Sequence, residues 1–284
     1  MYVERYGEGE RVYFGLHGWS GDRRTFAPLA AHMPRCASLY SADLPGCGKS
    51  PAAQSLTLDG VAKEIAKTIF VVAPHRQITL IGNCSGAILS LLAAERIQAK
   101  VARLVLIDPF AYWPWYFRVF VAKSFGRYAY RATFANSFGR WLTNQSLRGR
   151  RTAETDLTHS FGEIDHDVAQ SYLALLAEVE GVARFASLAH VPIDIVYGER
   201  TFGAVKKSVA MWQGIWPQAR ATALAGAGHL PILEATKQLS EIVFAGGEGG
   251  AGDVKSLQAE TKAETAATTR SAAAAQGKES EAQA

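Results

Sequence analysis

The chain has 284 residues, 48% of them hydrophobic, which is enough apolar material for one large core or for a core domain with an insertion. No apolar run approaches the roughly 20 residues of a membrane-spanning helix, and the N-terminal residues lack the pattern of a secretory signal. The formal net charge of +4 favours no particular partner. The three cysteines, without metal-ligand spacing, indicate a reducing, cytoplasmic environment with neither disulfides nor a metal site.

Short apolar runs and helix-like segments alternate in the first part of the chain. Four of the runs are expected to form strands: residues 11–16, 36–41, 78–81 and 101–107. Apolar side chains at helical spacing predict a helix over residues 56–72. Because this alternation is typical of right-handed crossover units, we predict an α/β fold with a mostly parallel central sheet and helices on both faces.

The loop after the second predicted strand contains Gly48-Lys49-Ser50, which matches the end of a phosphate-binding loop. The first glycine of that motif would lie at position 43, where this chain has Asp43. No nucleotide or other cofactor is therefore expected. We expect Asp43 to brace its own loop instead.

Residues 78–89 have the pattern of a strand, a sharp turn and a helix, with Cys84 at the apex. Gly82 and Gly86 flank the apex, and such small residues let the backbone fold back while the helix packs on the strands. The thiol would lie beside the helix N-terminus, where partial positive charge favours a thiolate. The motif therefore predicts either an exposed nucleophile or a passive cysteine in an ordinary strand-to-helix turn.

Residues 110–189 interrupt the alternation of strands and helices. They are helical in character and rich in aromatic residues, and they are long enough to form a small cap. Further strands at residues 191–197 and 219–224 and two helices then complete the pattern. The predicted organisation is a core of residues 1–109 and 190–245, a helical cap of residues 110–189, and a disordered low-complexity tail of residues 246–284.

The order of these motifs resembles that of the α/β-hydrolase family over residues 10–245. The matching segments, in chain order, are His17-Gly18-Trp19, Asp43-Leu44-Pro45-Gly46, Gly82-Asn83-Cys84-Ser85-Gly86, the insertion after Asp108, and Gly228-His229. The resemblance implies the α/β-hydrolase fold with a helical cap insertion. It also implies covalent catalysis by the residue at the apex of the elbow.

Position by position, the resemblance assigns Cys84 as the nucleophile and His229 as its general base. It places the backbone N–H groups of Trp19 and Ser85 in the oxyanion hole. The chain departs from the usual family pattern at the elbow, where cysteine replaces the more frequent serine. It departs again after the strand at residues 191–197, where the usual position of the acid is Thr201.

Three explanations for the catalytic acid remain open. Asp108 follows the strand at residues 101–107 and is the favoured acid, because some family members keep their acid there. Glu199, in the same loop as Thr201, is the alternative. A Cys84–His229 dyad without a strong third member is the last possibility.

Residues 112–151 combine basic and aromatic side chains and contain no acidic residue. The basic residues are Arg118, Lys123, Arg127, Arg131, Arg140, Arg148, Arg150 and Arg151. The candidate substrate-binding residues are Trp113, Trp115 and Phe117. An apolar lining with a basic rim suits an apolar acyl chain delivered on an acidic acyl carrier protein or on coenzyme A. An ordinary solvated cap is the simpler interpretation, membrane contact through residues 113–125 is not favoured, and no nucleic-acid binding is expected.

We therefore predict an acyl hydrolase or thioesterase that forms a covalent acyl-Cys84 intermediate on an apolar ester or thioester. An acyltransferase with the same intermediate is one alternative, because a long-lived acyl thioester favours transfer over hydrolysis. A catalytically inactive hydrolase fold kept for binding is the other alternative, with Thr201 as a sign of lost activity.

Overall fold

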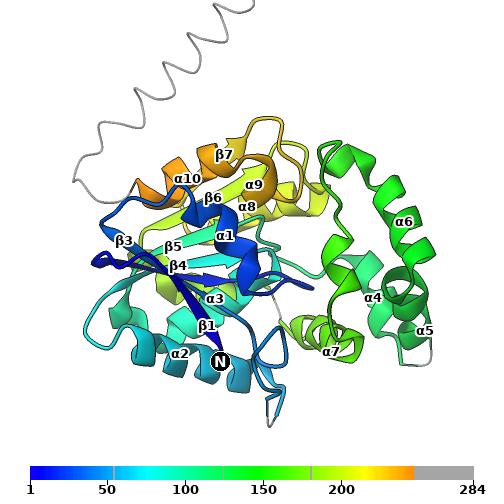
Figure 1. Ribbon diagram of the computed structural model, residues 1–284, viewed down its shortest axis with the longest axis horizontal. Coiled ribbons are helices and arrows are strands. Elements are labelled where there is room, and N and C mark those ends of the chain that lie inside the picture. Colours follow the sequence, from blue (N-terminus) through cyan, green and yellow to red (C-terminus); the bar gives the residue numbers. More distant parts are fainter. Residues whose placement is uncertain (54, 124, 180, 246–284) are drawn as a thin grey trace, which may run out of the picture. The chain divides into compact units, whose positions relative to one another are not determined.

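The structure is a computed structural model that describes residues 1–245 except residues 54, 124 and 180 (Figure 1). Residues Met1–Phe244 form one compact unit. The predicted tail of residues 246–284 lies outside the described residues.

In the described part of the chain, seven strands form one sheet in the order β1-β3-β2-β4-β5-β6-β7. The strands are β1 (Val3–Tyr6), β2 (Arg11–Leu16), β3 (Ala37–Ala42), β4 (Ile78–Asn83), β5 (Val101–Ile107), β6 (Ile193–Gly198) and β7 (Arg220–Leu224). All neighbouring pairs are parallel except β1 and β3, which are antiparallel. The predicted mostly parallel sheet is confirmed, and β1 is an edge strand that the sequence pattern did not predict.

Helices cover both faces of the sheet, as predicted (Figure 1). They are α1 (Ala27–Ala30), α2 (Leu58–Val72), α3 (Ser85–Arg96), α8 (Gly203–Ile215), α9 (Pro231–Glu234) and α10 (Thr236–Phe244). Successive residues of β5 point to opposite faces, as the pleat of a strand requires. Leu104 and Leu106 join the core that includes α2, α3 and α8, whereas Val105 and Ile107 join the core that includes α1 and α10.

The segment between β5 and β6 is helical in its described residues. It contains α4 (Trp115–Val121), α5 (Gly126–Tyr130), a π-helix (Arg131–Ala135), α6 (Ser137–Ser146) and α7 (His166–Leu176). Tyr130, Phe134, Phe161 and Ala169 form a small separate core in this segment, and Trp19 of the main body packs against it. Trp19 therefore lies where the helical insertion meets the loop after β2.

The strand register brings three loops to one edge of the sheet. Asn83 pairs with Ile107, and Ile107 pairs with Val196, so β4, β5 and β6 end side by side. Two further backbone hydrogen bonds extend this ladder, from Cys84 N–H to the Ile107 carbonyl at 2.7 Å and from Asp108 N–H to the Val196 carbonyl at 2.8 Å. The residues that follow these strands are thus fixed by the sheet itself, at the edge where ligands of parallel α/β sheets bind.

Removing one partner of a buried ion pair in this sheet should be strongly destabilising. Arg103 Nε donates to Asp194 Oδ2 at 2.6 Å, and its other nitrogens donate to the carbonyls of Ile242 and Val243 in the last turn of α10. Arg103→Leu leaves those acceptors without their buried donor, so we expect the free energy of unfolding to fall by about 3 kcal/mol. Urea titration followed by circular dichroism measures this change.

Arg220→Leu is the matched control for that variant. Arg220 pairs with the same carboxylate at 2.8 Å, but its side chain is 58% exposed, so its loss should cost about 1 kcal/mol or less. Equal losses of unfolding free energy in Arg103→Leu and Arg220→Leu would contradict a larger contribution from the buried arginine.

Candidate active site

Cys84 lies at the apex of a turn that only small neighbours permit. Its φ of 52° and ψ of −116° are unfavourable for a residue with a side chain. A Cβ added at Gly82 would lie 2.4 Å from the Ala87 Cα, and one added at Gly86 would lie 2.3 Å from the Leu16 carbonyl oxygen. Both glycines are therefore needed for α3 to pack against β2 and β4, which confirms the predicted strand–turn–helix geometry.

Asp108 and His229 meet although they are far apart in the sequence. His229 lies in the loop after β7, and its Nδ1 is 2.6 Å from Asp108 Oδ2. The Asp108 side chain is fully buried, and the Gly198 N–H donates to its Oδ1 at 2.9 Å. Of the two proposed acids, the structure thus brings Asp108 to the imidazole.

Burial and neighbouring charge act on His229 in opposite directions. Burial alone lowers its pKa, but the hydrogen bond to Asp108, a hydrogen bond to the Cys84 thiol and the charges of both partners raise it. The net effect raises the pKa of His229 above its ordinary value. An imidazole in this site therefore holds its proton at neutral pH, which suits a nucleophile that reacts as an anion.

Glu199, the alternative acid, points elsewhere. Its carboxylate accepts the Gly226 N–H at 2.8 Å and so supports the turn after β7. Glu199 is exposed, whereas the imidazole of His229 is mostly buried. The structure does not bring these two side chains together.

Thr201, which the sequence suggests as the place where the usual acid is missing and as a sign of lost activity, contacts both members of the pair. Its Oγ1 donates to Asp108 Oδ2 at 2.5 Å and lies 3.1 Å from His229 Nδ1. The side chain is fully buried. The signal that could have identified Thr201 was its position, because the family places a side chain there that faces the histidine.

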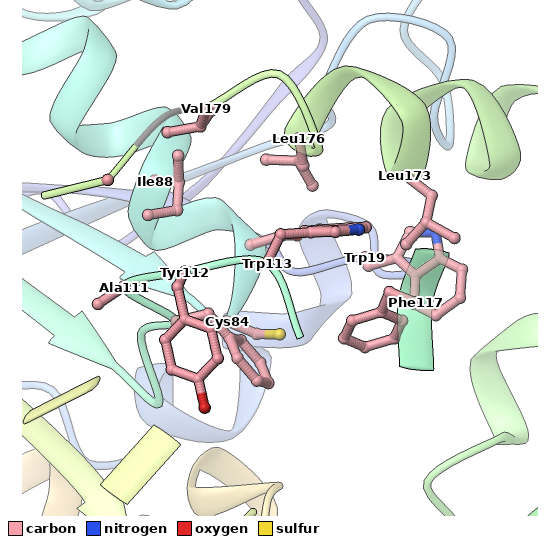
Figure 2. Close-up of a pocket in the computed structure, with 13 residues that line it drawn as sticks. Trp19, Cys84, Ile88, Ala111, Tyr112, Trp113, Phe117, Leu173, Leu176 and Val179 are labelled. Carbon is pink, nitrogen blue, oxygen red and sulfur yellow. The ribbon is translucent and has the colours of Figure 1, made fainter. Parts of the chain in front are cut away.

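An apolar cavity opens at the elbow. Figure 2 shows the sulfur of Cys84 pointing into it. The lining residues include Ile88 from α3 and, from the segment after β5, Ala111, Trp113, Phe117, Leu173, Leu176 and Val179. Of the three candidate substrate-binding residues, Trp113 and Phe117 line this cavity. Trp115 does not line it and is 76% exposed, because it lies on the outer face of α4.

The His17-Gly18-Trp19 loop passes directly beside the apex. A Cβ added at Gly18 would lie 3.1 Å from the Cys84 Cβ. His17 is buried, and its Nε2 accepts the Leu44 N–H at 3.0 Å, which places its proton on Nδ1 for a 2.8 Å bond to the Gly18 carbonyl. Burial lowers the pKa of His17, in keeping with this neutral form. The loop is therefore held in one conformation beside Cys84.

Trp19 and Ser85 lie on the walls of two cavities. Both residues line the apolar cavity and also a second one that extends toward the loops containing Gly46 and Asp165. The indole Nε1 of Trp19 donates to the Ala169 carbonyl at 2.8 Å, so its ring is fixed between the two cavities. Both residues predicted to form the oxyanion hole thus lie where the cavities meet, next to Cys84.

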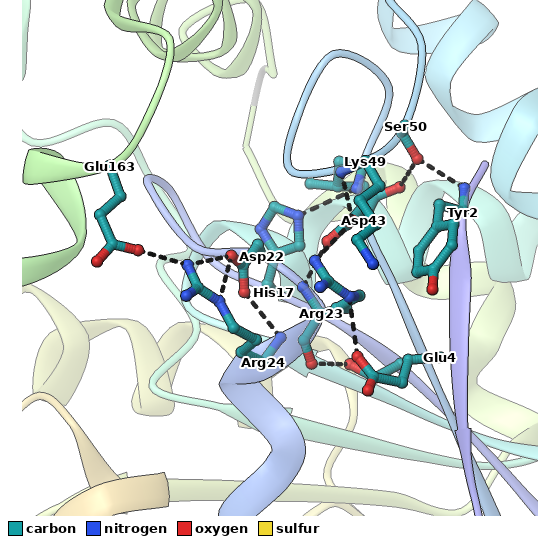
Figure 3. Close-up of polar contacts among 12 residues, drawn as sticks. Tyr2, Glu4, His17, Asp22, Arg23, Arg24, Asp43, Lys49, Ser50 and Glu163 are labelled. Atoms are coloured by element: carbon teal, nitrogen blue, oxygen red, sulfur yellow. Dashed lines mark hydrogen bonds and ion pairs between the residues drawn. The ribbon is translucent and has the colours of Figure 1, made fainter.

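Asp43 braces its loop, as expected. Its fully buried carboxylate accepts the Arg23 N–H at 2.6 Å and the Lys49 N–H at 2.7 Å, and it also pairs with the Arg23 side chain (Figure 3). Gly48 has a φ of 52°, and a Cβ added there would lie 2.4 Å from Asp43 Oδ2. The Gly48-Lys49-Ser50 segment therefore wraps a carboxylate of its own chain.

Arg150 connects the helical insertion to the two loops of the site. Its backbone carbonyl accepts the His229 N–H at 2.7 Å, and its Nη1 donates to the Thr201 carbonyl at 3.1 Å. A Cβ added at Gly228 would lie 2.1 Å from the same Arg150 carbonyl. Glycine before His229 therefore allows the insertion to pack directly on the histidine loop.

The insertion exposes large apolar side chains as well as basic ones. The exposed apolar residues are Trp115, Val119, Phe125, Tyr128, Phe138, Trp141 and Leu142. Arg127 and Arg131 pair with Asp167, whereas Arg118, Lys123 and Arg148 are exposed and form no ion pair within the described part of the chain. This surface is thus both apolar and basic.

The described residues contain neither a candidate metal site nor a candidate membrane-spanning helix. Within residues 1–245, apart from the three gaps, no group of histidine, cysteine and acidic side chains is arranged to hold a metal ion. None of the helices described there is long and apolar enough to cross a membrane.

The parallel sheet, the elbow after β4 and the histidine loop after β7 are the features of an α/β hydrolase. The family model for the alpha/beta hydrolase family matches residues 15–242, and the chain belongs to that family.

Two relatives of known function are pimeloyl-[acyl-carrier protein] methyl ester esterases. The one from Sodalis glossinidius is 27% identical over 247 residues, and the one from Salmonella agona is 25% identical over 246 residues. In both comparisons the match covers 82% of this chain and 92% of the relative.

Solved structures show the same fold at lower sequence identity. A thermophilic esterase from Thermogutta terrifontis has a TM-score of 0.69 at 19% identity and covers 85% of this chain and 90% of its own. An enol-lactonase from Burkholderia xenovorans has a TM-score of 0.68 at 16% identity and covers 86% of this chain and 95% of its own.

Proposed function

We propose that this protein hydrolyses esters of apolar acyl chains through a covalent acyl-Cys84 intermediate. The observation that carries the proposal is the arrangement at the sheet edge. The thiol of Cys84 faces an apolar cavity, and the His229–Asp108 pair lies behind it. The two relatives support an ester as the substrate, because both are esterases.

The geometry supports a two-step reaction. The Cys84 thiolate attacks the ester carbonyl carbon, and the N–H groups of Trp19 and Ser85 stabilise the oxyanion. The adduct collapses to the acyl thioester, and the departing alkoxide takes the proton from His229 Nε2. Neutral His229 then removes a proton from water, which attacks the thioester. The thiolate leaves, and the product acid gives up its proton to solvent.

The helical insertion acts in this proposal as a cap over the acyl chain. Phe117 from α4 and Leu173 and Leu176 from α7 lie on the cavity wall opposite the elbow. These side chains remove apolar surface of the substrate from water, at about 25 cal/mol per Å² buried. The second cavity beyond Trp19 provides space for the other side of the ester.

We also propose that the acyl chain reaches the site on an acyl carrier protein. The relatives act on esters of carrier-bound pimeloyl groups, which is what their names state. The insertion of this chain exposes Arg118, Lys123 and Arg148, and residues 112–151 contain no acidic side chain. A positive surface of this kind suits an acidic carrier.

Mass spectrometry of the intact protein and of its proteolytic peptides tests the proposal. The protein is mixed with methyl esters and with aryl esters of several chain lengths, free and carrier-bound, and then quenched in acid. We expect an acyl adduct on the peptide that contains Cys84, and release of free acid over several turnovers.

Cys36→Ala is the matched control, because Cys36 is an exposed cysteine away from the cavity. It should form the adduct at the same rate. If the parent protein forms no adduct and releases no acid at any chain length, the proposal is contradicted. Product that appears only when an alcohol or amine acceptor is added would instead identify acyl transfer.

A further inference from the structure

The hydroxyl of Thr201 lies within hydrogen-bond distance of both Asp108 and His229. Its hydroxyl, Asp108 Oδ2 and His229 Nδ1 form a closed triangle with sides of 2.5, 2.6 and 3.1 Å. The threonine side chain is fully buried in this triangle. We infer that Thr201 is a positioning residue, whose hydroxyl holds the Asp108 carboxylate toward His229, and this inference rests on the proposed function.

The donors and acceptors of the triangle allow one arrangement. An ionised Asp108 only accepts hydrogen bonds, so the single hydroxyl proton of Thr201 points to Oδ2. The Nδ1–H of His229 then points to the same oxygen, with the Thr201 oxygen as a weaker second acceptor. This arrangement leaves Nε2 of His229 for the reaction.

Thr201 and Gly198 together fix both oxygens of the carboxylate. The Gly198 N–H holds Oδ1 at 2.9 Å, and the Thr201 hydroxyl holds Oδ2. Rotation of the carboxylate about its last bond would break both hydrogen bonds. Asp108 also has a φ of 48°, an unfavourable backbone conformation that persists only where surrounding contacts enforce it.

The backbone of Thr201 is itself held on two sides. Its N–H donates to the Gly198 carbonyl at 3.1 Å, and its carbonyl accepts a hydrogen bond from Arg150. The hydroxyl is therefore aimed before substrate binds. Such preorganised partners of a catalytic group typically change rates by about 10- to 100-fold when removed.

A neutral donor at position 201 is also compatible with an acid at position 108. Two carboxylates at this separation would repel each other, and one would hold a proton at neutral pH. Threonine gives the second hydrogen bond without a second charge. This chain therefore keeps one buried negative charge beside the imidazole, contributed by β5 instead of β6.

The test compares three single variants of the full-length protein with the same ester substrate. Thr201→Val keeps the side-chain shape and removes the hydroxyl. Thr201→Ala also removes the hydroxyl but leaves a smaller side chain, and Thr201→Ser keeps the hydroxyl. We expect kcat to fall about 10- to 100-fold in the first two with KM changed less than about 3-fold. Thr201→Ser should stay within about 3-fold of the parent.

Thr68→Val is the control for loss of a buried threonine hydroxyl. Thr68 is 7% exposed, and its hydroxyl donates to the Glu64 carbonyl within α2. Thr68→Val should leave kcat unchanged. Thermal unfolding of every variant separates a loss of kcat from a loss of folded protein.

A relocated acid provides an independent test. Asp108→Asn removes the charge, and Thr201→Asp added to it returns a carboxylate at the position that faces Nδ1. We expect the double variant to regain at least about 10-fold in kcat over Asp108→Asn alone. No regain would overturn the placement of position 201 against the imidazole.

The inference and the proposed function fail in different ways. Equal kcat in Thr201→Val and the parent, with Asp108→Asn inactive, would overturn the inference alone. Equal losses in Thr201→Val and Thr201→Ser would also overturn it, because the effect would then follow bulk and not the hydroxyl. Full activity in both Asp108→Asn and Cys84→Ala would instead overturn the proposed function.

Discussion

Cys84→Ala is expected to lose at least about 10⁴-fold in kcat, because the alanine variant has no atom that can form the acyl intermediate. Alanine fits the turn, since the unfavourable backbone at position 84 tolerates a Cβ already. Binding of an apolar substrate should persist, because the walls of the cavity are unchanged. Steady-state hydrolysis of an aryl ester measures the first effect, and fluorescence titration with a non-hydrolysable analogue measures the second.

Cys84→Ser sharpens the same prediction through its pH dependence. Serine must give its proton to His229. The variant loses the contributions of the Cys84 thiol to the pKa of this histidine, but the hydrogen bond to Asp108 and the charge of Asp108 still raise it, so part of the imidazole is already protonated at neutral pH. The serine variant should therefore be slow at neutral pH and become faster as the pH rises and His229 loses its proton. A serine variant as fast as the parent at neutral pH would contradict the assigned state of His229.

Asp108→Asn should produce the second largest loss, about 10³-fold or more in kcat. The amide cannot supply the negative charge that holds the Nδ1–H, so the imidazole loses both its orientation and its raised pKa. The protonated fraction of His229 at neutral pH should fall as a result. Stopped-flow measurement of the acylation burst isolates the affected step, and NMR titration of labelled histidine reports the change in pKa.

Glu199→Gln is the matched control for this variant. It removes a carboxylate from the neighbouring loop, where Glu199 supports the Gly226 N–H and does not reach His229. We expect kcat within about 2-fold of the parent, as for most surface substitutions. A large loss in Glu199→Gln with a small loss in Asp108→Asn would reverse the assignment of the acid.

The elbow could be predicted from sequence because its determinants are local. Gly82, Cys84 and Gly86 lie within five positions, and the close approaches that require glycine follow directly from a strand that turns into a helix. The alternation of strands and helices similarly fixed the parallel sheet. The edge strand β1 was missed because it is short and only partly buried, so its sequence has no clear alternation.

The sequence favoured Asp108 as the acid but left Glu199 and a Cys84–His229 dyad open, because the choice depends on contacts distant in the sequence. Asp108 and His229 are 121 positions apart, and their meeting depends on the register of β5 with β6 and on the left-handed backbone at Asp108. Glu199 is excluded only by the turn at Gly226, whose N–H it accepts. No spacing rule describes either feature.

The inner and outer faces of α4, in the helical insertion, could not be predicted from the sequence either. Helix α4 has aromatic side chains on both of its faces, so helical spacing does not distinguish the face toward the cavity from the face toward solvent. Phe117 lies on the inner face, and Trp115 lies on the outer one. Only the packing of α4 against α7 decides between them.

The hydrogen bond between the His229 N–H and the Arg150 carbonyl links the local stability of the insertion to that of the histidine loop. Any opening that lifts residues 148–151 from the core leaves this amide without its partner, so its hydrogen becomes free to exchange with solvent. The hydrogen-exchange rate of the His229 amide therefore measures how often the insertion opens. In a molecule whose insertion has opened, the histidine loop is no longer held by the Arg150 carbonyl.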